Sequence, residues 1–194
     1  MNMSGINANY HNPYSTSSIK RNTSGGNFSD NVGNVSTYHT PSLTLYGSVD
    51  GETGDKVIGA WANAQSGIST TVYKPQDFDE ENPVYRVKIW DADGNLMEER
   101  MVNISEFVPG RSDSFDMYAY SCYLSDSGEY PDAMGRFMMS HAHYEGSQKA
   151  FTGENLFDKL DWLSIIKNIM KEQYTLGNLK GYMDYKSFLD ALQR

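Results

Sequence analysis

Two segments of the sequence contain residues that could bind a metal ion, but their spacing favours other roles. Asp91–Asn95 begins like a calcium loop, yet an EF-hand needs glycine at the sixth position and glutamate at the twelfth, where this chain has Leu96 and Val102. Asp-Gly is instead typical of a tight hairpin turn. His141 and His143 could share a metal on a strand, but on a helix they point about 200 degrees apart. No cysteine or glutamate at suitable spacing completes a zinc site, so we expect no metal and no cofactor.

Cys122 is the only cysteine, and with a histidine it could act as a nucleophile. It shares the apolar stripe of an expected helix with Phe115, Ala119 and Tyr123. Burial in apolar surroundings raises a thiol pKa and makes the group inert. We therefore expect Cys122 to be a core residue.

Two pairs of carboxylates stand at helical spacing, Asp113 with Asp116 and Asp158 with Asp161. Such pairs are typical of solvated helix faces or of first turns, where they favour the helix dipole. Two carboxylates brought together by the fold could still hydrolyse a glycoside. The sequence contains no Gly-x-Ser-x-Gly elbow, phosphate-binding glycine loop or His-Glu-x-x-His helix.

The strand expected at 84–90 has one face that could make contacts. Alternation along a strand places Arg86, Lys88 and Trp90 opposite its apolar residues. Exposed tryptophan and arginine often anchor protein contacts, so these three residues are the candidate binding set. Alternatively, helices cover that face as well and bury Trp90.

The composition excludes several partners. The 194 residues include 16 lysines and arginines against 25 aspartates and glutamates, a formal charge of −9. We expect neither nucleic acid nor an anionic membrane as a partner. The longest acidic run, Asp77–Glu81, is either a solvated loop or a cation site. No stretch approaches the roughly 20 apolar residues of a membrane helix, and Met1–Tyr10 lacks the apolar core of a secretory signal. We expect a cytoplasmic protein, with export by a signal-independent route left open.

The order of the expected elements is that of an α+β protein, an antiparallel sheet packed against helices. Residues 1–40 are rich in Asn, Ser, Thr and Gly and are expected to be a disordered tail, and 41–194 a single domain. The sheet is expected at about 41–104, with 56–64 ambiguous between strand and short helix but closer to strand, and 84–104 a hairpin around Asp93-Gly94. Helices are expected at about 113–193: 113–124 capped by Ser112, one beginning near Pro131, 153–175 capped by Thr152, and 182–192. The helix at 153–175 is expected to be the main cover of the sheet.

Several segments resemble an uncharacterised family of clostridial-type Firmicutes proteins. They include Ala60-Trp61-Ala62-Asn63, Asn82-Pro83-Val84-Tyr85-Arg86-Val87, Trp90–Asn95 and Ser140-His141-Ala142. The resemblance covers most of 41–194 and implies a bacterial origin and one folded unit. No activity, ligand or partner is attached to the family.

No recognisable catalytic set is present, so we expect a non-enzymatic interaction or structural module whose partner is another protein. The alternative is a hydrolase whose active site is assembled only in three dimensions. A cleft with converging carboxylates or histidines would favour the hydrolase, and an aromatic surface without one would favour the interaction module.

Overall fold

The computed structural model describes residues 47–63, 66–147 and 157–194. All of them belong to one compact unit, residues 39–194. The expected tail at 1–40 and the first strand signal, at 43–45, lie outside the described residues.

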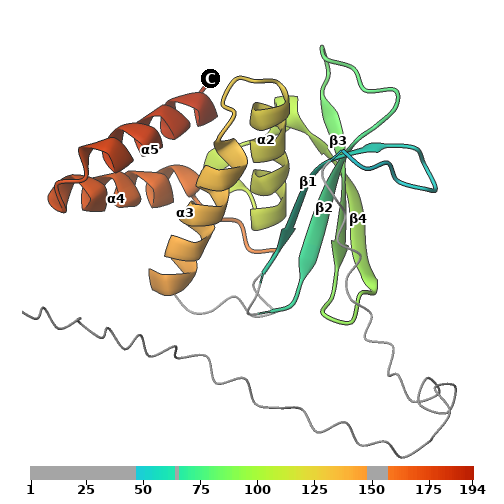
Figure 1. Ribbon diagram of the computed structural model, residues 1–194, viewed down its shortest axis with the longest axis horizontal. Helices are drawn as coiled ribbons and strands as arrows, with labels where there is room; N and C mark the ends of the chain where they lie inside the picture. Colours follow the sequence, from blue (N-terminus) through green and yellow to red (C-terminus); the bar gives the residue numbers. More distant parts are fainter. Residues whose placement is uncertain (1–46, 64–65, 148–156) are drawn as a thin grey trace, which may run out of the picture. The chain divides into compact units, whose positions relative to one another are not determined.

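Four strands form an antiparallel sheet in the order β1-β2-β3-β4 (Figure 1). They are β1 (Lys56–Ala62), β2 (Ser69–Lys74), β3 (Val84–Trp90) and β4 (Leu96–Asn103). The ambiguous segment that begins at residue 56 is therefore a strand over Lys56–Ala62, as favoured by the sequence. The hairpin is confirmed: β3 pairs with β4, and Gly94 adopts φ 84° in the turn. The Asp91 carboxylate accepts hydrogen bonds from the backbone N–H groups of Asp93 and Asn95, so the calcium-like segment is a turn.

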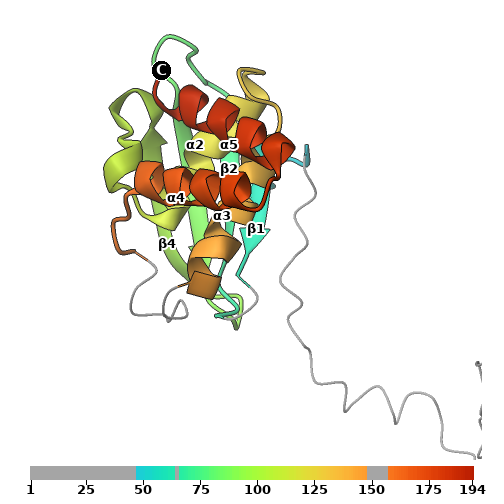
Figure 2. The ribbon, with the colours of Figure 1, turned by 90° about the vertical axis from the view of Figure 1, so that its left-hand side faces the viewer.

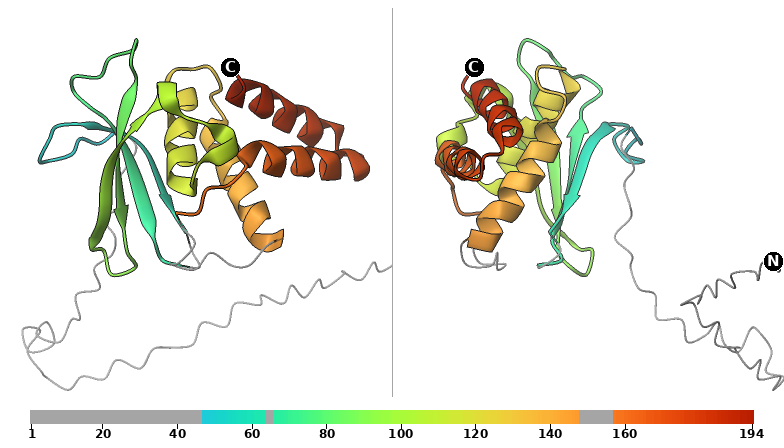
Figure 3. Two further views of the ribbon diagram at one scale, coloured as in Figure 1. Left: turned by 180° about the vertical axis from the view of Figure 1, so that it is seen from behind. Right: turned by 60° about the vertical axis from the view of Figure 1, so that its left-hand side comes forward.

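In the described part of the chain, four α-helices lie on one side of this sheet, which confirms the α+β class (Figures 1 and 3). They are α2 (Ser114–Asp126), α3 (Ala133–Ser147), α4 (Trp162–Thr175) and α5 (Leu179–Leu192), with two short 3-10 helices, η1 (Ile104–Glu106) and η2 (Pro109–Arg111), between β4 and α2. The predicted cap of α2 is one residue off, because the Asp113 side chain, not Ser112, accepts from the N–H groups of Phe115 and Asp116. None of the described helices is long and apolar enough to cross a membrane.

The helix expected at 153–175 begins later than predicted. Thr152 and Leu156 lie outside the described residues, and 157–161 is not helical. Leu160 instead exchanges backbone hydrogen bonds with Ser112, at 2.9 and 3.3 Å. Asp161 then caps α4 by accepting from the Ser164 N–H. A distant partner thus satisfies the backbone that local periodicity assigned to a helix.

The helix that covers the sheet is α2, not 153–175 as expected. Gly59 in β1 allows α2 to approach the sheet closely, because a Cβ there would collide with Cys122 Sγ. Figure 2 shows α4 and α5 lying together across α2 and α3, away from the sheet. The buried residues of α4 are Trp162, Ile166 and Ile169. The spacing along 153–175 predicts a different apolar stripe, made of Leu156, Leu160, Leu163, Ile166, Met170 and Tyr174.

Candidate functional site

The predicted binding residues of β3 are not an open surface. Arg86 and Lys88 are only 7% and 9% exposed, and Trp90 is half-buried. The exposure expected of Arg86 and Lys88 is therefore wrong. The alternative, in which helices cover this face, is also not what the structure shows: the turn at 50–55 supplies the partners of both cations.

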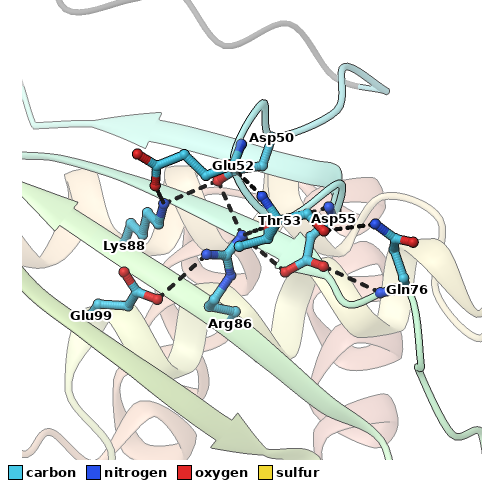
Figure 4. Close-up of polar contacts among 8 residues, drawn as sticks. All are labelled: Asp50, Glu52, Thr53, Asp55, Gln76, Arg86, Lys88 and Glu99. Carbon is cyan, nitrogen blue, oxygen red and sulfur yellow. Dashed lines mark hydrogen bonds and ion pairs between the residues drawn. The ribbon is translucent and has the colours of Figure 1, made fainter.

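Arg86 is the centre of a compact charge cluster (Figure 4). Its Nη2 lies 3.1 Å from Asp50 Oδ2 and 2.9 Å from Asp55 Oδ2, and its Nη1 lies 3.4 Å from Glu99 Oε1. Lys88 Nζ contacts the same Asp50 Oδ2 at 3.0 Å. The Arg86 guanidinium also lies 4.7 Å from the centre of the Tyr73 ring.

The electrostatics of this cluster are those of a closed structural site. Burial alone would raise the pKa of Asp50, but hydrogen bonds from the Glu52 backbone and from Lys88 outweigh it and lower the pKa to about 2. Asp50 is therefore ionised at neutral pH, and its ion pairs, with those of Asp55, hold the turn at 50–55 against β3. Asp50-Gly51 and Gly54-Asp55 are turn signals in the sequence, but they do not indicate that the turn pairs with Arg86 and Lys88.

Cys122 is a core residue, as expected. It is completely buried, and burial raises its thiol pKa. The carboxylates of Asp113 and Asp116 are also engaged, since both bind Arg100 and Lys159 at distances from 2.7 to 3.2 Å. These groups are placed to stabilise the start of α2 rather than to react.

The two histidines of α3 point to different surroundings. His141 is buried against the Trp61 ring, and burial lowers its pKa to about 4. His143 lines a groove along α4, where its Nε2 lies 2.7 Å from Glu172 Oε2. Ser164 borders the same groove but donates its hydroxyl to Asp161, so it is not aligned with His143 as a nucleophile. In the described part of the chain, no three His, Cys, Asp or Glu side chains gather as metal ligands would.

A second groove contains exposed aromatic and acidic groups together. It has a volume of about 840 Å³, in the range of small-ligand sites. We call it the aromatic groove and define it by Phe107, Tyr120, Tyr123, Glu80, Glu81 and Glu129. The loop after β2, the segment between η1 and η2, the second half of α2 and the residues just after it supply these side chains, and the end of α5 borders them.

The rings of the aromatic groove form a continuous surface. Phe107 and Tyr120 stack with their centroids 4.3 Å apart and 12° between their planes. Tyr123 follows 5.9 Å from Tyr120 at 45°. All three side chains are half-buried, so each keeps part of its ring accessible.

The carboxylates of the aromatic groove have no ion-pair partner among the described residues. Glu80, Glu81 and Glu129 form no ion pair with any described lysine or arginine. Burial, and then the charge of Glu129, raises the pKa of Tyr120, and the same two causes, with a hydrogen bond donated to Glu129, raise that of Tyr123 to about 12. The aromatic groove is therefore an electronegative site.

No protein-family model, curated protein or solved structure matches this chain. The resemblance to the clostridial-type family stays a prediction. The sequence of the acidic run at 77–81 is compatible with a solvated loop or a cation site. In the structure, its last two residues line the aromatic groove. The residues that line the groove with Glu81 include Tyr120 and Glu129, which spacing could not reveal because they lie 39 and 48 residues further along the chain.

Proposed function

We propose that this protein is a non-enzymatic interaction module whose aromatic groove binds a segment of another protein. One observation carries the proposal: three half-buried rings and three carboxylates that form no ion pair with a described residue share a groove of ligand-binding size. Aromatic side chains are enriched where proteins meet, because they bury a large apolar area and lose little conformational freedom. We extend the proposal to a bacterial cytoplasm, in keeping with the family resemblance and the single thiol of Cys122.

The reactive side chains considered outside the aromatic groove favour a binding function over hydrolysis, because each is already engaged or buried. Arg86 and Lys88 are already neutralised by buried carboxylates, and Cys122 is inaccessible. In the groove beside His143, the Ser164 hydroxyl donates its hydrogen bond to Asp161 and is not aligned as a nucleophile. The aromatic groove differs from these sites because its carboxylates form no ion pair with a described residue and its rings are only partly buried.

Binding can be tested by NMR with three pools of decapeptides, one acidic, one neutral and one basic. We expect at least one pool to shift the ring signals of Phe107, Tyr120 and Tyr123 in the full-length protein. Tyr120→Leu keeps the apolar volume but removes the ring, so it should weaken that binding several-fold. Tyr174→Leu, at an exposed position on α4, is the matched control and should leave it unchanged.

Two results would count against the proposal. The first is that no pool perturbs the aromatic groove at millimolar peptide. The second is that peptides are cleaved during the titration, which mass spectrometry would show and which would favour the hydrolase alternative.

A further inference from the structure

We propose that the occupant of the aromatic groove is a basic segment of polypeptide, with a lysine or arginine side chain held against Tyr120 and Tyr123 between the glutamates. The inference rests on the proposed function and names the chemistry of its partner. The charge of the ligand is the added claim, because a groove that bound an apolar or an acidic segment would still be an interaction site.

The rings are the first argument for a cation. The face of an aromatic ring is electronegative, and a lysine or arginine within about 6 Å of its centre is attracted to it. Tyr120 and Tyr123 present two such rings, 5.9 Å apart and inclined at 45°, to one groove. A side-chain cation lying in the groove beside this pair could approach both rings.

The same arrangement recurs inside this protein, with its cation present. Lys74 Nζ lies 4.3 Å from the centre of the Phe78 ring and 2.8 Å from Asp126 Oδ2. Arg136 lies 5.4 Å from the Tyr185 ring and pairs with Asp184 at 3.0 Å. In each case a ring and a carboxylate hold one cation between them.

The rings and carboxylates of the aromatic groove form no cation–ring contact or ion pair with a lysine or arginine of the described residues. Glu80, Glu81 and Glu129 form no ion pair with a described residue, whereas Asp126 and Asp184 do. Arg194 also borders the groove, but it forms neither an ion pair nor a cation–ring contact with the described residues. Its charge provides a test, because it should repel a basic ligand and attract an acidic one.

The size and lining of the groove favour a polypeptide over a small free cation. The volume of about 840 Å³ exceeds what one ammonium group needs. Pro83 and Leu192 border the groove but are buried, so the apolar surface beyond the rings comes from the partly buried Leu163. The aliphatic stem of a lysine or arginine and the residue next to it could pack there, while a free polyamine would leave this surface unused.

The test is fluorescence anisotropy of a labelled decapeptide in which lysine and arginine alternate with serine and glycine. Its counterpart carries glutamate at the charged positions. The full-length protein should bind the basic peptide, with an affinity that falls as salt rises. The triple variant Glu80→Gln/Glu81→Gln/Glu129→Gln should weaken binding by about tenfold or more, because three favourable charge contacts are lost. Arg194→Gln should strengthen it about two- to threefold.

A second triple variant controls for net charge. Glu52→Gln/Asp93→Asn/Asp158→Asn also removes three negative charges, but at exposed positions outside the lining of the groove. It should retain most of the affinity. An equal loss in both triple variants would overturn the site, since the attraction would then come from overall charge.

The remaining outcomes separate this inference from the proposed function. If the acidic peptide binds at the groove and Arg194→Gln weakens it, the basic ligand is wrong while the interaction module stands. If neither these peptides nor the mixed pools bind, both are wrong. Spermidine should displace the basic peptide only at far higher concentration, and displacement at equal concentration would overturn the polypeptide as the ligand.

Discussion

Replacing Arg86 tests whether the charge cluster on the sheet is structural. The side chains of Arg86, Asp50 and Asp55 are 8%, 8% and 11% exposed, so water cannot replace a lost partner. Arg86→Met keeps most of the side-chain volume but leaves two buried carboxylates with less compensation. Removing one partner of a buried ion pair destabilises a protein by about 3–5 kcal/mol. This is a large part of the roughly 5–15 kcal/mol by which most domains are stable.

The assay is urea unfolding followed by circular dichroism at pH 7. Lys180→Met is the matched control, because this lysine also forms a short ion pair, with Asp184 at 2.7 Å, but its side chain is 83% exposed. Exposed pairs contribute at most about 1 kcal/mol. The control should therefore unfold close to the wild-type midpoint, while Arg86→Met unfolds at much lower urea.

The pH dependence has a defined sign. The pKa of Asp50 is about 2 in the folded state, below its ordinary value of 3.8. Its ionised form therefore adds stability that is fully present above about pH 4 and is lost as pH falls toward 2. Arg86→Met removes a positive charge 3.1 Å from Asp50 and should raise this pKa, so the stability gap between variant and wild type should narrow as pH falls from about 4 toward 2. A loss below about 1 kcal/mol at pH 7, or a gap that stays constant with pH, would refute the structural role.

Three further predictions concern the core. Ile166→Ala should cost about 2–5 kcal/mol in urea unfolding and Leu163→Ala clearly less, because Ile166 is completely buried and Leu163 is only partly buried; equal losses would contradict this placement of α4. Gly59→Ala should cost about 1–3 kcal/mol, since the new Cβ collides with Cys122 Sγ; an unchanged unfolding midpoint would show that α2 is free to move. His141 should titrate by NMR near pH 4, below its ordinary 6.5, so stability is expected to fall as pH drops from about 6.5 to 4; a midpoint near 6.5 would mean that the ring is not buried.

Local chemistry determined the parts of the fold that the sequence predicted well. The β3–β4 hairpin depends on alternation and on Asp93-Gly94, both of which act within a few residues. The start of α4 was misplaced because Leu160 bonds to Ser112, nearly 50 residues earlier in the chain. Periodicity cannot reveal such a partner.

The candidate site shows the same limit. Alternation correctly placed Arg86 and Lys88 on one face of β3, but their burial depends on Asp50, whose position is set by tertiary contacts. The aromatic groove was not predicted at all, because Glu81, Tyr120 and Leu192 meet only after folding. Composition signalled it only indirectly, through the 14 tyrosines and the acidic run at 77–81.

The most direct measurement of the central claim is a set of intermolecular NOEs between the bound basic decapeptide and the full-length protein. We predict NOEs from the side-chain methylene protons of a peptide lysine or arginine to the ring protons of Tyr120 and Tyr123. Saturating peptide that gives NOEs only to another exposed apolar surface, such as Leu176 and Leu179 at the turn between α4 and α5, would contradict the account.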